Sequence, residues 1–382
     1  MKIGFLLPRS TVYPLIGFDF LDGFKVHLQQ LQDITAIEFF TENIGFGIDE
    51  KITYAATEQL LLKNNVDVVI AFIDERSVEM IAPLFTATGK ILCIVNMGAN
   101  FNFGVAPPST TLFLDFNVAF NSSITGKKAI GNGYDKAIMA TSYYDGGYLQ
   151  CFAMVNNYLN HGGKMMGNYV SNFKPSEFNL NTLQQQVETA AENTCILALF
   201  SGDVAHLFYQ QYAAIQQQQD VKVFGSPMMF DHHIQGLLPT DIDITPIQGY
   251  TSWLPQLENA ANIELKERFT AYANRQASVF AVLGWEAAQV IYQLFSADNN
   301  SLTAAQKVKQ LMDKSMDTPR GKLYFDAETH HAYSSTYYVE MANQFQISVI
   351  EKIENPDEEW SSFKKQQPQT TASGWRNTYL CS

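Results

Sequence analysis

Four polar residues follow an apolar run in the first quarter of the chain, and their types suit an anionic ligand. Asp74, Glu75, Arg76 and Ser77 stand between a strand-like run at 66–72 and a helical pattern at 77–88. Free N–H groups at a helix N-terminus favour an anion such as a carboxylate. We expect Ser77 to cap this helix, and Asp74, Arg76 and Ser77 to border a ligand site. In the alternative, the charges form a solvated turn and Ser77 only caps.

Other residues whose side chains could take part in catalysis or metal binding do not stand at the spacings that these functions require. The sequence contains no GxGxxG, GxxxxGK[ST], GxSxG or HExxH motif, and the GxG pairs at 44–49 and 130–135 are weak signals. The histidine runs at 231–233 and 330–331 predict surface loops, because adjacent residues rarely converge on one ion. No nucleophile stands with a base at a recognisable spacing. We therefore expect no enzymatic activity, no cofactor and no metal site.

Charge, hydropathy and cysteine content exclude several classes of protein. The net charge is −13 and no Lys/Arg cluster occurs, which argues against a nucleic-acid partner. No apolar run reaches the ~18 residues of a membrane span, so we expect no membrane insertion. The four cysteines lack zinc-site spacing. Cys93 and Cys195 lie in apolar runs typical of buried free thiols, whereas a Cys151–Cys381 bridge is left open.

The strands and helices that must position these residues are predicted from two alternating spacings of apolar residues, one typical of strands and one typical of helices. Hydrophobic residues make up 46% of the chain, which is ample for large cores. The first half predicts strands at 2–8, 34–40, 66–72 and 89–96, with helices near 17–31, 50–64 and 77–88. The second half repeats the pattern, with strands at 135–144, 163–170, 194–200 and 221–227 and helices near 146–161, 179–191 and 203–217. Buried parallel strands covered by helices on both faces give this alternation.

The last third of the chain changes character. Residues 262–314 predict helices, and 321–326 and 335–353 predict strands, the second stretch containing a hairpin around the "ANQ" turn. The polar tail after Asn355 is expected to lie on the surface. The predicted fold class is α/β with two doubly wound parallel-sheet lobes. Such sheets bind ligands at the carboxyl ends of their strands, so we expect the site in a cleft between the lobes.

Several segments in order resemble one known family. These segments are "IGFLLPRSTVYPLIGFDFLDGFKVHL" (3–28), "VVIAFIDERSVEMIAPL" (68–84), "CIVNMGAN" (93–100), "SYYDGGYLQ" (142–150) and "GKLYFDAETH" (321–330). Together they resemble the type I periplasmic binding proteins, particularly the branched-chain amino acid (Leu/Ile/Val-type) substrate-binding proteins of ABC transporters. The matching blocks span about residues 3–350.

The resemblance implies a Venus-flytrap architecture whose two lobes are joined by a three-crossover hinge. Lobe 1 would comprise 1–118 plus 252–333, and lobe 2 would comprise 119–251 plus 334–382. The crossovers would lie near 115–121, 249–254 and 331–336. It further implies capture of a ligand by hinge closure.

The resemblance also implies a set of ligand contacts, from which this chain departs in part. The family's contacts fall on Ile16, Ser77, Ala99, Asn100, Tyr144, Met228 and the neighbourhood of Asp203. Amino-acid binders carry an acidic residue for the α-ammonium where this chain has Met228, with Asp231 three residues later. A cleft with Met228, Tyr13, Tyr144 and Tyr250 would suit a flatter, more apolar ligand, although Asp203 or Asp231 could still supply the missing charge.

Two functions follow from the resemblance. The first is an extracytoplasmic solute-binding protein that delivers a small amino acid-like or aromatic carboxylate compound to the permease of an ABC importer. The second is a cytosolic ligand-sensing regulator similar to the amidase-operon negative regulator. The chain opens "MKIGFLLP" without the ~7–15 apolar residues of a signal peptide. Either an export signal has been removed, giving a periplasmic or extracellular protein, or Met1 is native and the protein is cytoplasmic.

Overall fold

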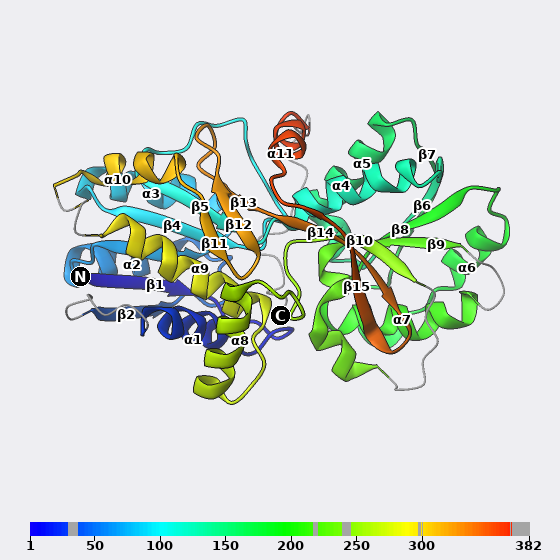
Figure 1. The fold of residues 1–382 in the computed structure, drawn as a ribbon, viewed down its shortest axis with the longest axis horizontal. Coiled ribbons are helices and arrows are strands. Elements are labelled where there is room, and N and C mark those ends of the chain that lie inside the picture. The colour runs from blue at the N-terminus through cyan, green and yellow to red at the C-terminus, as the bar shows by residue number, and fades with distance from the viewer. Residues whose placement is uncertain are drawn as a thin grey trace.

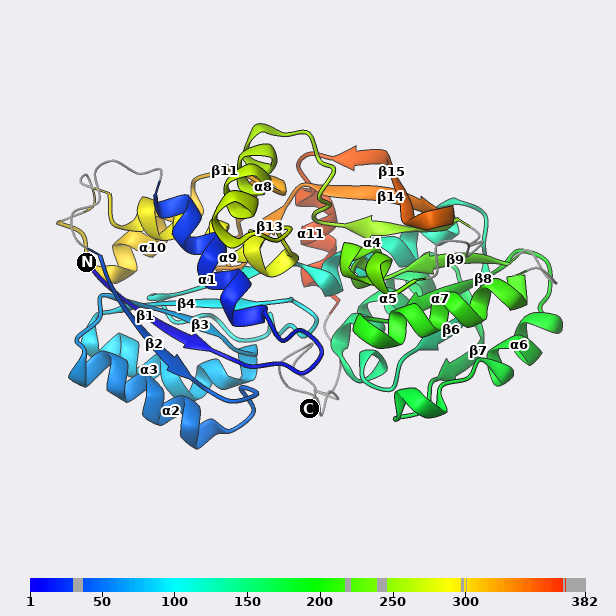
Figure 2. The same cartoon turned by 90° about the horizontal axis from the view of Figure 1, so that it is seen from below.

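The chain forms two α/β lobes that lie side by side (Figure 1). The computed structural model describes residues 1–29, 37–216, 221–238, 246–296, 299, 301–366 and 368. The predicted fold class is confirmed, because each lobe is built on its own parallel sheet with helices on both faces (Figure 2). None of the helices in these ranges has the length and apolar content to cross a lipid bilayer.

The first lobe is a five-stranded, fully parallel sheet in the order β2-β1-β3-β4-β5. Its strands are β1 (Lys2–Leu7), β2 (Glu38–Asn43), β3 (Val68–Phe72), β4 (Ile91–Asn96) and β5 (Thr111–Asp115). Figure 2 shows α2 (Glu50–Glu58) and α3 (Val78–Thr88) below the sheet, and α1 (Ile16–Leu28) and α9 (Val279–Leu294) above it. A Cβ at Gly284 would stand 2.0 Å from the Phe20 carbonyl oxygen, so this glycine lets α9 cross α1 closely.

The second lobe is a seven-stranded sheet in the order β15-β14-β10-β9-β8-β6-β7. The parallel strands are β6 (Lys136–Thr141), β7 (Lys164–Val170), β8 (Thr194–Leu199), β9 (Lys222–Gly225) and β10 (Ile247–Thr251). The hairpin of β14 (Thr336–Ala342) and β15 (Gln346–Ile353) adds two antiparallel strands, as predicted around the "ANQ" turn. The helices are α4 (Val118–Gly131), α5 (Leu149–Asn160), α6 (Asn181–Glu188) and α7 (Gly202–Gln216).

Two further elements complete the first lobe. Helices α8 (Ala260–Ala273) and α10 (Ala304–Met312) flank α9 in sequence. A small antiparallel sheet is formed by β11 (Met316–Thr318), β12 (Gly321–Phe325) and β13 (Ala332–Ser334). His331, just before β13, forms an isolated bridge with Phe113 of β5 in the five-stranded sheet, and β13 leads directly into β14 of the second lobe.

Three chain crossings between the lobes are joined by one side chain. The Asn121 amide donates to the Ser252 hydroxyl at 2.8 Å, and its carbonyl oxygen accepts from the Thr336 hydroxyl. All three residues are buried. A buried polar group must be hydrogen-bonded to avoid a large penalty, so these bonds hold the crossings in register.

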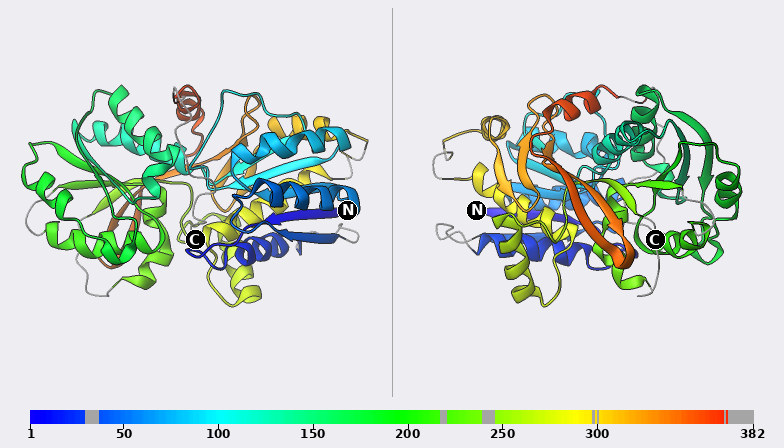
Figure 3. Two further views of the ribbon diagram at one scale, coloured as in Figure 1. Left: turned by 180° about the vertical axis from the view of Figure 1, so that it is seen from behind. Right: turned by 45° about the vertical axis from the view of Figure 1, so that its right-hand side comes forward.

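Several elements differ from those predicted. The sequence patterns did not indicate β5, α4 or β10. The polar tail after Asn355 was predicted to lie on the surface, and this is wrong for α11 (Asp357–Lys364), whose Trp360 and Phe363 are buried with Phe101 and Phe120. α11 lies over the junction of the lobes (Figure 3). The start of the predicted strand at 34–40, and Cys381 with its proposed bridge to Cys151, lie outside the described residues.

Candidate functional site

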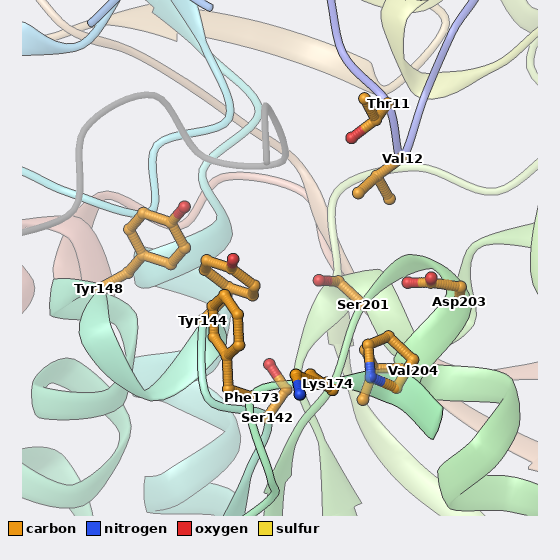
Figure 4. Close-up of a pocket in the computed structure, with 11 residues that line it drawn as sticks. Thr11, Val12, Ser142, Tyr144, Tyr148, Phe173, Lys174, Ser201, Asp203 and Val204 are labelled. Atoms are coloured by element: carbon orange, nitrogen blue, oxygen red, sulfur yellow. The ribbon is translucent and has the colours of Figure 1, made fainter. Parts of the chain in front are cut away.

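A cavity of about 200 Å³ lies between the two lobes. The loop after β1 contributes Thr11 and Val12, and the other lining residues come from the carboxyl-end loops of β6, β7 and β8 in the second lobe. Figure 4 shows Tyr144 and Tyr148 on one side, Ser201 and Asp203 on the other, and Thr11 and Val12 facing them. The remaining lining residues are Ser142, Phe173, Lys174, Pro175 and Val204. The cavity therefore sits where open α/β sheets bind ligands.

Aromatic rings form one wall of the cavity. Tyr144, after β6, and Phe173, after β7, have ring centroids 5.7 Å apart, and Tyr143 packs edge-on against both. Tyr148 is buried, whereas Phe173 is 56% exposed. Phe173 therefore presents apolar surface that a planar ligand ring could cover.

Two serine hydroxyls that line the cavity are held by a buried carboxylate. Ser201 donates to Asp145 Oδ1 at 2.9 Å, and Ser142 donates to Asp145 Oδ2 at 2.6 Å. Burial raises the pKa of Asp145 to about 6, although the serine hydrogen bonds oppose this shift. Because the hydroxyl proton of Ser201 points to Asp145, its oxygen is left as an acceptor toward the cavity. A ligand O–H or N–H donor would complement it.

The N-terminus of α7 faces the loop after β1. Gly202 has φ +55°, and a Cβ there would stand 2.4 Å from Val12 Cγ1. Glycine at this position thus allows the two lobes to touch beside the cavity. The next residue, Asp203, lines the cavity and is exposed.

Among the described residues that line the cavity, Lys174 is the one with a cationic side chain. Its ammonium group is exposed and lies 3.3 Å from Glu177 Oε1. An exposed ion pair of this kind is weak and exchanges readily, so Lys174 remains available to a ligand carboxylate.

Tyr13 connects the lobes next to the cavity. Its hydroxyl donates to Asp231 Oδ2 at 3.3 Å and accepts from the backbone N–H of Gly202. Burial and the charges of Asp231 and Asp145 raise the pKa of Tyr13 well above its usual value. Burial acts to raise the pKa of Asp231, but the hydrogen bond and charge of His233 outweigh it and lower that pKa. Asp231 is thus held as a carboxylate that accepts from both lobes.

Of the residues proposed from the sequence, Tyr144 and Asp203 line this cavity, and Tyr13 lies beside it. Ile16 and Met228 are buried in the main core, and Tyr250 lies in the apolar cluster that contains Phe101, Phe120 and Trp360, where its ring is tilted against that of Tyr338. No acidic residue stands at the Met228 position, and Met228 itself is 1% exposed.

The polar residues after β3 occupy the hinge side of the junction. Asp74 accepts from Arg76 at 3.1 Å and from the Asn100 amide at 2.8 Å. Ser77 is the N-cap residue of α3, as predicted, but its side chain makes no capping bond; Asp74 instead accepts from the Arg76 N–H at the start of the preceding 3₁₀ turn, Glu75–Ser77. A carboxylate one turn earlier satisfies the free donors, which leaves Ser77 buried within the turn.

Ala99 and Asn100 contact the second lobe directly. The Gln150 N–H donates to the Ala99 carbonyl at 2.8 Å, and the Leu149 N–H donates to Asn100 Oδ1 at 3.1 Å. These bonds satisfy two free donors at the N-terminus of α5, whose own cap residue Tyr148 offers no side-chain bond. Asn100 therefore links Asp74 in one lobe to α5 in the other.

Sequence reasoning did not single out most of the lining residues: Thr11, Val12, Ser142, Tyr148, Phe173, Lys174, Pro175, Ser201 and Val204. Ser142 and Ser201 each follow an observed strand within two residues, at the edge where such sheets bind ligands, although the predicted strand at 135–144 had included Ser142. The histidine runs were predicted to be surface loops, and this is wrong for Asp231 and His331, which are buried.

Comparison with known proteins identifies a matching family and several solved structures with a similar fold. The sequence model described as "periplasmic binding protein" matches residues 1–346. A solute-binding protein of an ABC transporter from Rhodopseudomonas palustris, solved with benzoate, is 21% identical with a TM-score of 0.73, covering 92% of this chain and 95% of its own. A comparison with curated protein sequences gives no match.

Two further solved structures have the same fold. A solute-binding protein from Rhodopseudomonas palustris BisB5, in complex with 3,4-dihydroxybenzoic acid, is 16% identical with a TM-score of 0.73, covering 93% of this chain and 97% of its own. An amino acid ABC transporter substrate-binding protein from Pseudomonas fluorescens Pf-5 is 12% identical with a TM-score of 0.73, covering 98% of both chains. At these identities the similarity establishes the architecture, and the ligand must be argued from the cavity.

Proposed function

The chain belongs to the periplasmic binding protein family, and on that premise we propose that it captures a small aromatic carboxylate for an ABC importer. The observation that carries this proposal is the inter-lobe cavity, in which Tyr144, Tyr148 and Phe173 stand with Lys174 and two serine hydroxyls. A volume of about 200 Å³ lies below the ~300 Å³ at which ordinary drug-sized sites begin. The size favours a ligand with a single ring.

Each part of such a ligand has a partner. The ring would lie against Tyr144 and Phe173, where offset or edge-on contacts are favourable. The carboxylate would pair with the Lys174 ammonium. A ring hydroxyl would donate to Ser201, whose oxygen is an acceptor because its proton is directed to Asp145. A hydroxybenzoate satisfies all three positions at once.

The solved relatives support a ligand of this class. Two Rhodopseudomonas palustris proteins of the same fold were solved with benzoate and with 3,4-dihydroxybenzoic acid. Amino acids are a weaker fit, because a free α-ammonium needs an anionic partner and the described lining residues offer one only in an exposed, solvent-screened side chain. Asp203 is the lining acid that could take that role.

We further propose that Tyr144 and Asp203 contact the ligand, and that the lobes divide at the crossovers near 115–121, 249–254 and 331–336. The remaining sequence-derived contacts, including Ser77, Ala99 and Asn100, stay predictions. Ala99 and Asn100 would have to exchange their bonds to α5 for bonds to a ligand. We place the protein outside the cytoplasm, where its family acts, with an ABC permease as its partner. The cytosolic regulator has no specific observation in its favour.

Calorimetry with 4-hydroxybenzoate, benzoate, leucine and acetamide tests the proposal. We expect 4-hydroxybenzoate to bind most tightly, then benzoate, with leucine and acetamide far weaker. A ligand at a hundredfold excess over its Kd should raise the free energy of unfolding by about 2.7 kcal/mol. Preferential binding of leucine would reassign the site to amino acids, and preferential binding of acetamide would favour the regulator. Absence of any melting shift with the aromatic acids would contradict the proposal.

A further inference from the structure

Three potential metal-ligand atoms converge at the hinge side of the first lobe, apart from the ligand cavity. They belong to Glu75, in the turn after β3, to Asp115, at the end of β5, and to His331, on the approach to β13. His331 Nε2 lies 3.0 Å from Glu75 Oε1 and 3.6 Å from Asp115 Oδ2, and all three donor atoms lie within 4.8 Å of one another. The side chains of all three are 8% exposed or less.

Two of these side chains are oriented by a second set of bonds. The Asn102 backbone N–H donates to Glu75 Oε2 at 2.8 Å, which aims the other oxygen at His331. His331 Nδ1 lies 2.9 Å from the Thr329 carbonyl oxygen, to which it can only donate. A histidine whose Nδ1–H is held by a backbone carbonyl presents Nε2 to a metal, which is the common arrangement in metalloproteins. The Phe113 ring, stacked on His331 at 4.2 Å, fixes the imidazole plane.

Asp115 supplies an independent sign that a ligand is missing from the cluster. Its side chain is 4% exposed and is directed at His331, yet its Oδ1 has no hydrogen-bond partner among the described residues. A buried carboxylate oxygen without a donor is costly, so natural structures rarely leave one. The oxygen that faces His331 is Oδ2, so a cation between the three residues would satisfy Oδ1 by binding both oxygens of the Asp115 carboxylate.

Distance and charge both suit a divalent transition ion. Ligand atoms about 2.0–2.2 Å from a tetrahedral Zn²⁺ stand roughly 3.3–3.6 Å apart, close to the two separations seen here. Two carboxylates balance the charge of a divalent ion. A cavity of about 120 Å³, lined by Glu75 and His331, adjoins the cluster and has room for a water molecule as the fourth ligand.

We propose that Glu75, Asp115 and His331 form a binding site for a divalent transition-metal ion such as Zn²⁺. The ion would join the carboxyl ends of β3 and β5 to the chain that enters β13, from which the third crossover leaves for the second lobe. Its function would therefore be to stiffen the hinge side of the first lobe. The proposal does not rest on the identity of the ligand in the inter-lobe cavity.

The test uses the full chain, stripped with a chelator and then titrated with Zn²⁺ and Co²⁺. We expect one ion per chain, a rise in melting temperature, and Co²⁺ absorption bands of a low-symmetry site, with Mg²⁺ and Ca²⁺ much weaker because imidazole is a poor ligand for them. Asp115→Asn and His331→Gln should each weaken Zn²⁺ binding by more than the ~10–100-fold typical of lost second-shell contacts. His233→Gln, in the other histidine cluster, should leave it unchanged.

The alternative is a purely structural ion triad, with His331 protonated between the two carboxylates. It predicts that the unaltered protein binds no Zn²⁺ tightly, and that result would overturn the proposal. Unchanged Zn²⁺ affinity in folded Asp115→Asn would also overturn it. If His331→Gln unfolds, Glu75→Gln replaces it, because this change keeps the bond from Asn102 while removing a charged ligand.

Discussion

The hydroxyl of Tyr13 donates a hydrogen bond to the carboxylate of Asp231 at 3.3 Å, and this bond joins the two lobes beside the ligand cavity. Tyr13 lies in the loop after β1, and Asp231 follows β9 in the second lobe. The bond can form only when the lobes are close together. It therefore contributes to the equilibrium between open and closed forms, and through it to ligand affinity.

Tyr13→Phe removes this bond while keeping the ring. A hydrogen bond to a charged group contributes about 1.5–3 kcal/mol, so we expect binding of 4-hydroxybenzoate to weaken by roughly tenfold or more. Calorimetry gives the affinity, and small-angle scattering of the ligand-bound protein gives the closure. Unchanged affinity, with an unchanged scattering profile, would show that the bond plays no part in closure.

Tyr144→Ala tests the aromatic wall. We expect binding of benzoate to weaken by about tenfold or more, because the ligand ring loses a stacking partner worth ~0.5–1.5 kcal/mol together with buried apolar area. Tyr272→Ala, an exposed tyrosine on α8, is the matched control and should leave affinity unchanged. A loss of unfolding free energy in Tyr144→Ala without a loss of affinity per folded molecule would return Tyr144 to a structural role.

Lys174→Met tests the partner of the ligand carboxylate. Lys174 is exposed, so the pair with the ligand should contribute about 1 kcal/mol, or roughly fivefold in affinity. The effect should shrink at high salt, and Lys174→Arg should retain most of the affinity. If Lys174→Met binds benzoate as well as the unaltered protein does, the carboxylate lies elsewhere, with the N-terminus of α7 as the next candidate.

Asp145 should make stability depend on pH. Its folded pKa of about 6 lies above the ordinary 3.8, so the folded protein binds more protons than the unfolded chain between these values. The contribution of the buried neutral acid is fully present below about pH 4 and is lost as pH rises through about 6, a change of about 3 kcal/mol. Urea unfolding from pH 4 to 7 should show this slope in the unaltered protein relative to Asp145→Asn. Parallel curves for the two proteins would contradict the assignment.

A buried ion pair between Arg320 and Glu286 should dominate stability in the first lobe. Both side chains are fully buried, and the guanidinium also donates to the Asp115 carbonyl at 2.8 Å. Arg320→Met leaves a buried carboxylate without its partner, which should cost about 3–5 kcal/mol of unfolding free energy. Arg268→Met breaks an exposed pair with Glu264 and should cost less than about 1 kcal/mol. Similar losses in the two variants would show that burial does not set the importance of these pairs.

Most of the fold could be predicted because its signals are local. β3 and β4 are continuous apolar runs, which is typical of strands covered on both faces. The helices predicted beside them showed the spacing of apolar residues that is typical of a helix. α4 escaped detection for the opposite reason: Asn121, Ser122, Ser123 and Thr125 are polar, and yet they are buried. Asn121 and Thr125 find partners in the other crossovers, at Ser252, Thr336 and the Tyr250 N–H, which no local pattern reveals.

The residues of the candidate site likewise divide into those that could be predicted from the sequence and those that could not. Tyr144 and Asp203 were proposed from the family resemblance, and both lie just after strands, whose carboxyl ends share one edge of a parallel sheet. Phe173, Lys174 and Ser201 obey the same rule but did not stand out among many polar and aromatic loop residues. Asp145 acquires its raised pKa only from burial beneath these loops.

The sequence by itself determined two parallel sheets and their order along the chain, because strand and helix periods depend on neighbouring residues, and it predicted the edge at which such sheets bind ligands. Only the tertiary structure decided the hinge and the clusters around it. His331 meets Glu75 across 256 residues of chain, and Asn121 meets Thr336 across 215. Such contacts are fixed by how the lobes and crossovers pack in three dimensions. The neighbouring residues in the sequence therefore do not indicate that these contacts form.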